Sequence, residues 1–193
     1  GDDRGAPQTR PRLSRRRQRK SSRERWRPPT DYATAIDLRT TTLSALNERC
    51  RIFHRLHESG CFVIPNPWDV GSARLLTQLG FKALATTSSG FAWSQGRVDG
   101  GVPLDDVLAH LRTLSASVSV PISADFEGGF SDDAEGVEKH VAAAATTGIA
   151  GLSIEDSTGN PSHPLFDFAL AVERIRAARQ AIAGSGHALV LTA

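Results

Sequence analysis

From about residue 40 onward, short continuous runs of apolar residues alternate with segments in which apolar residues recur at helical spacing. Short continuous apolar runs that end at Gly, Pro, Asn or Asp are typical of strands buried on both faces of a parallel sheet. Segments with apolar residues every three or four positions are typical of helices that cover such a sheet. The predicted strands are "CFVIPN" (61–66), "FKALATTSS" (81–89), "VPISADF" (120–126), "AGLSIED" (150–156) and "HALVLTA" (187–193).

Helices are predicted before and between these strands, and Asp69 and Asp132 are expected to cap two of them. The segment 88–103 is predicted as a loop. Repeated strand–helix units indicate an α/β protein, either a (β/α)8 barrel or an open doubly wound sheet. No GxGxxG motif follows the first strand, so nothing supports a dinucleotide fold. The predicted helices span 41–58, 69–80, 104–116, 132–148 and 167–184.

The net charge of +2 conceals an uneven distribution. Residues 1–29 carry eleven Arg and Lys against three acidic residues, and the remainder carries twelve against eighteen. Because so few apolar residues cannot offset the entropy of ordering, we predict a disordered basic tail at 1–39. The tail could bind nucleic acid, act as a transit peptide or be a passive extension. The passive interpretation is favoured, and nucleic acid is not expected as a partner.

Cysteine usage and hydropathy suggest a compartment. Cys50 and Cys61 are the only cysteines and show no CxxC spacing, which favours two reduced thiols. No apolar run approaches the length of a membrane span, so no membrane partner is expected. We therefore expect a cytoplasmic protein.

The predicted strands end in polar residues. Asp125 and Glu127 follow the third strand, Glu155 and Asp156 follow the fourth, and a Thr- and Ser-rich loop follows the second. In parallel α/β folds these carboxyl ends share one face, where catalytic groups collect. A single Asp there is more often a helix cap, but a set of carboxylates without Cys or His suits Mg²⁺ or Mn²⁺.

Three segments carry a resemblance to a known family: "TTSSGFAWSQGRVDG" (86–100), "VPISADFEGG" (120–129) and "GLSIED" (151–156). Together they resemble the isocitrate lyase / phosphoenolpyruvate mutase superfamily, in particular a phosphonomutase-like member. The resemblance implies a (β/α)8 TIM-type barrel, a homo-oligomer and a need for Mg²⁺. It also implies cleavage or formation of C–C or P–C bonds in a small 2-oxo or phosphono carboxylic acid.

The resemblance further implies roles for particular residues. Asp125 would be the direct metal ligand and would contribute to substrate binding. The other acidic residues would complete the metal's surroundings, largely through water, and take part in catalysis. The substrate's carboxylate and oxo group would be held partly by backbone N–H groups. The acidic set is Asp99, Glu127 and Glu155, and the substrate-binding set is Ser89, Gly90 and Phe91.

Two departures leave the subgroup open between lyase, mutase and hydrolase. Glu127 stands where much of the family has Asp. The lyases' Lys-Lys-Cys-Gly-His-like run is missing, and the loop after Asp156 reads "STGNPSHPLFD" (157–167). His163 in this loop could donate a proton, although a solvent-facing loop histidine is the more common case.

The predicted barrel is incomplete. Five strands cannot close an eight-stranded barrel, so 40–193 is expected to be a partial domain, truncated after the fifth strand, with low activity. The alternative function is a non-catalytic scaffold that carries a nucleic-acid-binding tail.

Overall fold

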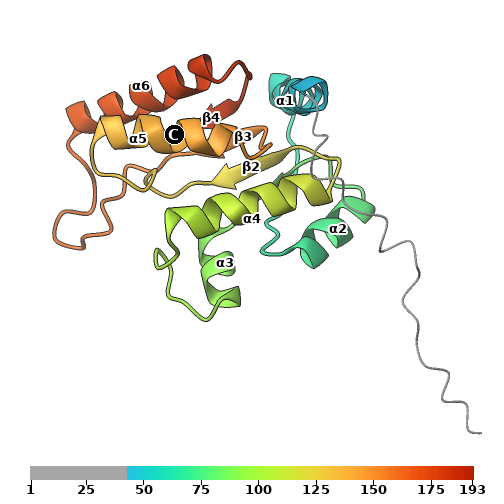
Figure 1. The fold of residues 1–193 in the computed structure, drawn as a ribbon, viewed down its shortest axis with the longest axis horizontal. Helices are drawn as coiled ribbons and strands as arrows, with labels where there is room; N and C mark the ends of the chain where they lie inside the picture. The colour runs from blue at the N-terminus through green and yellow to red at the C-terminus, as the bar shows by residue number, and fades with distance from the viewer. Residues whose placement is uncertain (1–42) are drawn as a thin grey trace, which may run out of the picture. The chain divides into compact units, whose positions relative to one another are not determined.

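A single parallel sheet organises the chain. The computed structural model describes residues 43–193, so the predicted basic tail at 1–39 lies outside the described residues. The strand order in the sheet follows the sequence without reversal, and all neighbouring strands are parallel (Figure 1). A doubly wound sheet would reverse its order at a switch point, whereas barrel strands pair in sequence order. The barrel alternative is therefore confirmed, as a partial barrel. The strands are β1 (Leu84–Ala85), β2 (Ile122–Asp125), β3 (Gly151–Ser153) and β4 (Val190–Thr192).

Within residues 43–193 six helices accompany these strands, and five of them were predicted from the apolar periodicity. The helices α5 and α6, which precede and follow β3 along the chain, lie side by side (Figure 1). The capping box that Asp69 forms with Ser72 starts α2 as predicted. The helices are α1 (Leu43–Glu58), α2 (Val70–Gln78), α3 (Ser88–Ser94), α4 (Leu104–Ser117), α5 (Ala134–Ala145) and α6 (Phe168–Gly184).

The first predicted strand, at 61–66, is wrong. These residues are extended beside β1 but form no strand. Pro65 O accepts a hydrogen bond from Ala85 N (3.1 Å), and the Asn66 side-chain amide donates to Ala85 O (3.1 Å). Pro65 and Pro67 have no N–H to donate, so a regular ladder cannot continue here.

Two other local predictions are also wrong. The segment 88–103, predicted as a loop, begins with the short helix α3, which Thr87 caps by accepting from Gly90 N (3.2 Å). The cap of α5 is Asp133 rather than Asp132, with Asp133 Oδ1 accepting from Gly136 N (2.7 Å). Both errors concern short-range capping, where neighbouring polar residues compete for the same role.

The two faces of the sheet differ. Ile122 and Ala124 of β2 are buried, whereas Ser123 and Asp125 alternate with them and are half-buried on the opposite face. The register pairs Asp125 with Ser153 of β3, so their side chains share that face at the carboxyl end. The face of β2 that carries Ser123 and Asp125 therefore borders the candidate site at its carboxyl end.

Helix α1 contacts the opposite end of the strands. His54 Nε2 lies 2.9 Å from Ala188 O, just before β4, and Arg49 Nη1 donates to Ser115 O (2.7 Å) near the end of α4. This placement keeps α1 away from the carboxyl ends. None of the helices within 43–193 has the length and apolar character that a membrane crossing requires.

Candidate metal and substrate site

Asp125 is held firmly at the carboxyl end of β2. Its Oδ2 accepts hydrogen bonds from the backbone N and the Oγ of Ser88, both at 2.8 Å. Its own backbone N donates to Thr86 Oγ1 (2.9 Å). The other oxygen, Oδ1, receives only a long contact of 3.5 Å from Glu127 N. Two hydrogen bonds to one oxygen fix the carboxylate's orientation and leave Oδ1 able to coordinate a cation.

The four predicted carboxylates interact with one another. Burial raises the pKa of Glu127 above its ordinary value, and the negative charges of Asp125, Asp99 and Glu155 raise it further. Partial burial also raises the pKa of Glu155, and the charges of Asp125, Asp99 and Asp156 add to that effect. The structure therefore brings the sequence-predicted acidic set into one field of like charge.

None of the ion pairs within residues 43–193 involves these four carboxylates. The ion pairs in this part of the chain join Glu48 to Arg51 and Arg55, and Asp106 to Arg97. Crowded carboxylates without a cationic partner repel one another, and a bound cation removes that repulsion.

A cavity of about 630 Å³ gives this acidic set access to solvent. Its lining includes Asp99, Glu127 and Glu155, together with the start of the loop after β3. Asp125 and Glu127 line an adjoining cavity of about 10 Å³, and Ser88 borders both. Residues from three separate segments therefore surround one opening at the carboxyl end of the sheet.

The donor set fits a hydrated magnesium ion. Among residues 43–193, no three His, Cys, Asp or Glu side chains are placed to hold one ion together. Mg²⁺ is commonly bound through one or two carboxylates and retains several waters, so it needs no such cage. Asp125 with its free Oδ1 would be the direct ligand, and the three other carboxylates would act through water.

The structure places the predicted substrate-binding residues on α3. Gly90 N donates to the cap Thr87 Oγ1 (3.2 Å), and Phe91 N donates to Thr87 O (3.0 Å). Ser89 Oγ lies 3.3 Å from Thr87 Oγ1. The backbone N–H groups of Gly90 and Phe91 thus form hydrogen bonds within the first turn of α3. Substrate binding by Ser89, Gly90 and Phe91 stays a prediction.

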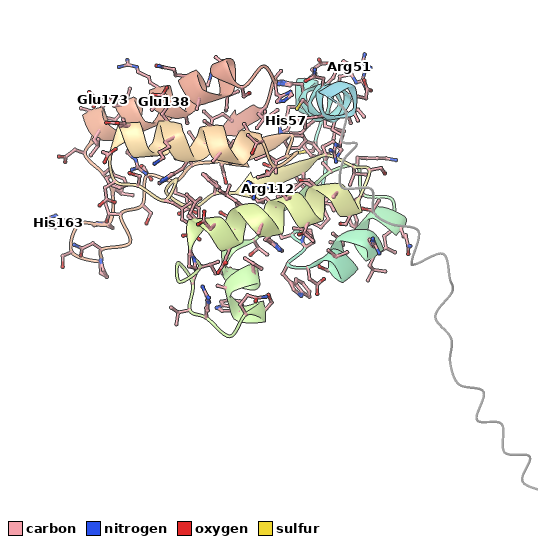
Figure 2. All side chains as sticks on the ribbon, viewed as in Figure 1. Arg51, His57, Arg112, Glu138, His163 and Glu173 are labelled. Atoms are coloured by element: carbon pink, nitrogen blue, oxygen red, sulfur yellow. The ribbon has the colours of Figure 1, made fainter. Side chains whose placement is uncertain are left out.

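His163 lies in the exposed loop between β3 and α6. It is exposed, and Figure 2 shows it at the outer end of the loop between β3 and α6. Its backbone O accepts from Thr158 Oγ1 and its N donates to Asn160 O (3.0 Å), so the main chain there forms a local turn. This placement agrees with a solvent-facing loop histidine.

Comparison with known proteins identifies the family. The sequence model for phosphoenolpyruvate phosphomutase matches residues 53–193. This chain belongs to the phosphoenolpyruvate phosphomutase family. The superfamily expected from the motifs at 86–100, 120–129 and 151–156 is thereby confirmed.

Several members of this family or its superfamily are similar to the chain. An uncharacterized protein of Mycobacterium tuberculosis is 39% identical over 129 residues, which is 66% of this chain and 48% of that protein. The 2-methylisocitrate lyase of Escherichia coli is 34% identical over 118 residues, covering 57% of this chain and 40% of the enzyme. The chain thus spans about half the length of the curated relatives it matches.

Solved structures share the fold. A candidate lyase/mutase from Burkholderia cenocepacia superposes with a TM-score of 0.74 at 42% identity, covering 77% of this chain and 53% of that one. A 2,3-dimethylmalate lyase of the same superfamily gives a TM-score of 0.67 at 31% identity, covering 76% and 52%. The relatives of this chain in the phosphoenolpyruvate phosphomutase family and its superfamily therefore include proteins named as lyases and mutases.

Sequence reasoning missed three residues that shape the site in this phosphoenolpyruvate phosphomutase family member. Ser88 and Thr86 anchor Asp125, although the motif "TTSSG" drew attention to Ser89 instead. Knowing that α3 begins at Ser88 would have favoured it, because the first residues of a helix have free N–H groups. His110, on α4, lines the small cavity beside Asp125, and no motif signalled it.

His110 provides a test of this part of the phosphoenolpyruvate phosphomutase fold. Burial lowers its pKa to about 4, and the charge of Asp69 opposes that shift only in part. Its ring stacks on Phe91 with centroids 3.7 Å apart, and its Nε2 is buried without a hydrogen-bond partner. The folded state therefore binds fewer protons than the unfolded state between pH 6.5 and 4, so stability falls as pH falls through this window.

We expect the His110→Phe variant, which keeps a ring stacked on Phe91, to lack this loss of folding stability at low pH. Between pH 7 and 4.5 the wild-type free energy of unfolding should fall by about 2 kcal/mol relative to the variant, after a discount for partial exposure. Urea unfolding of both proteins at the two pH values measures the difference. If the free energy of unfolding changed equally with pH in the two proteins, the interpretation of His110 as a neutral imidazole would be contradicted.

Proposed function

We propose that this chain is part of an enzyme that uses Mg²⁺ or Mn²⁺ to cleave or rearrange a C–C or P–C bond in a small 2-oxo or phosphono carboxylic acid. One observation carries the proposal. Four carboxylates from three separate segments lie close enough to raise the pKa of two of their members, and they form no ion pair in the described part of the chain.

The roles follow from the contacts. Asp125 is the direct metal ligand, because Ser88 saturates its Oδ2 and leaves Oδ1 open. Asp99, Glu127 and Glu155 hold the metal's waters and supply catalytic carboxylates. Ser89, Gly90 and Phe91, at the start of α3, bind the substrate's carboxylate and oxo group once the ligand is present.

The chemistry explains why an acidic site would serve such a substrate. Cleavage beside a carbonyl develops negative charge on oxygen, and a divalent cation supplies the positive charge that stabilises it. The protein's contribution is to orient Asp125 and to keep the remaining carboxylates within reach of the waters. Burial and the neighbouring carboxylates raise the pKa of Glu127 and Glu155, so these two side chains hold a proton more readily than ordinary glutamates.

One fold relative offers context for the metal. A phosphonopyruvate hydrolase solved with oxalate and Mg²⁺ has a TM-score of 0.68 at 21% identity, covering 74% of this chain. Identity at that level establishes the fold alone, so the metal assignment here depends on this chain's own carboxylates.

Titration calorimetry of the full chain tests the proposal. We expect saturable binding of Mg²⁺ or Mn²⁺, and binding of oxalate, an enolate mimic, only when the metal is present. Where Glu127 and Glu155 are partly protonated, metal binding should also release protons, because a bound cation favours their charged forms. The measured heat would then vary with the ionisation enthalpy of the buffer. Absence of saturable heat with either metal would refute the proposal.

A further inference from the structure

The turn after β2, which carries Glu127, has an unusual backbone. Glu127 has φ 48° and Phe130 has φ 58°, and Gly129 between them has φ 74°. Left-handed backbone costs about 1–3 kcal/mol at a non-glycine residue and persists only where surrounding contacts enforce it. Something in the fold must therefore hold this turn.

Several hydrogen bonds enforce part of the turn. Glu155 N donates to Glu127 O (2.9 Å), which links the turn to the end of β3. Gly129 N donates to Phe126 O (2.9 Å), and His140 Nδ1 lies 3.0 Å from Gly129 O. The carbonyls of Gly128 and Ser131 are not covered by these contacts.

Arg174 of α6 binds both of those carbonyls. Its Nη2 donates to Gly128 O and its Nη1 donates to Ser131 O. The guanidinium also lies over the Phe166 ring, 3.9 Å from the centroid. The residue is only 1% exposed, which makes it one of the largest fully buried side chains of the chain. A planar fork of donors can span two carbonyls and stack on a ring at once, which a lysine cannot do.

The charge of Arg174 is balanced outside the acidic set. Burial lowers the pKa of its guanidinium, and Asp132 and Asp133 oppose that shift. It forms no ion pair with the four carboxylates, although it borders the same cavity. Its two printed hydrogen bonds go to backbone carbonyls of the turn, so its direct contact with the site is through the turn.

We propose that Arg174 is a positioning residue for the metal site. It fixes the left-handed turn at Glu127–Phe130 and so directs the Glu127 carboxylate toward Asp125, Asp99 and Glu155. The inference rests on the proposed function, since its consequence is measured as metal affinity. Through Phe166 it also joins the loops after β2 and β3, which carry two of the four carboxylates.

The test compares three single variants of the full chain by titration calorimetry with Mg²⁺. Arg174→Lys keeps the charge but cannot span both carbonyls, and we expect affinity to fall by about 10-fold to 100-fold, the usual effect of losing a residue that orients a ligand. Gly128→Ala disturbs the same contact from the other side, because its Cβ would lie 3.3 Å from Arg174 Nη2 and 3.5 Å from Ser157 O. It should weaken binding in the same direction. Arg176→Lys, exposed on the same helix, is the matched control and should leave affinity unchanged.

Thermal unfolding of each variant separates positioning from folding. If wild-type chain binds Mg²⁺ and both Arg174→Lys and Gly128→Ala bind it equally well, the positioning role is overturned while the proposed function stands. If wild-type chain binds no Mg²⁺, the proposed function fails and the inference fails with it. Loss of cooperative unfolding in both variants would show that Arg174 serves folding instead, which also overturns the proposal.

Discussion

Replacement of Asp125 by Asn is expected to weaken Mg²⁺ binding by at least about 100-fold, since residues that only orient a metal ligand already contribute about 10-fold to 100-fold. Asn keeps the shape of the side chain, and its amide oxygen can still accept from Ser88 N and Oγ, which hold Asp125 at 2.8 Å. The charge at the open Oδ1 is lost. The fold should therefore persist while the affinity measured by calorimetry collapses.

Asp132→Asn is the matched control for Asp125→Asn. Asp132 borders the same cavity as Glu127 and Glu155, but it does not contribute to the raised pKa of either. Removing its charge should change Mg²⁺ affinity only slightly. Equal losses in the two variants would mean that the cavity attracts cations by general charge, without a specific ligand at Asp125.

Replacement of Gly151 by Ala is expected to destabilise the fold. An added Cβ would lie 2.7 Å from Phe53 Cε1 and 2.8 Å from Val190 O. The second contact is with backbone of β4, which cannot turn aside as a side chain could. Overpacking of this kind costs about 1–3 kcal/mol, so the melting temperature should fall by about 2–12 °C.

Gly184→Ala, at the end of α6, serves as the comparison for Gly151→Ala. No atom lies within 4 Å of its added Cβ, and alanine favours helix more than glycine does. Its melting temperature should equal or slightly exceed that of the wild-type chain. An equal melting temperature for Gly151→Ala would show that α1 and β4 move apart easily at this end of the sheet.

Local periodicity was sufficient for most of the architecture. The helices now described as α2, α4, α5 and α6 were predicted within a few residues, because their apolar positions recur at helical spacing. The prediction of a strand at 61–66 failed because a short apolar run alone does not show whether a neighbouring strand can pair with it. Pro65 and Pro67 prevented that pairing.

The acidic residues of the site were accessible from sequence for a similar reason. Asp125 is the last residue of β2 and Glu155 lies two residues after β3, and parallel strands bring their carboxyl ends to one face. The anchoring residues were not accessible in this way. Ser88 differs from Ser89 by one position, and Arg174 lies 46 residues from its partner Gly128.

The order of amino acids was enough to predict alternating strands and helices, the parallel class and the carboxylates at the strand ends, since each depends on neighbours a few positions apart. Only the tertiary structure decided between barrel and doubly wound order, selected Ser88 as the anchor of Asp125 and brought Arg174 to the turn at Glu127. Those features depend on contacts between distant segments, whose energies are set once α6 packs beside α5 and the strands are in register.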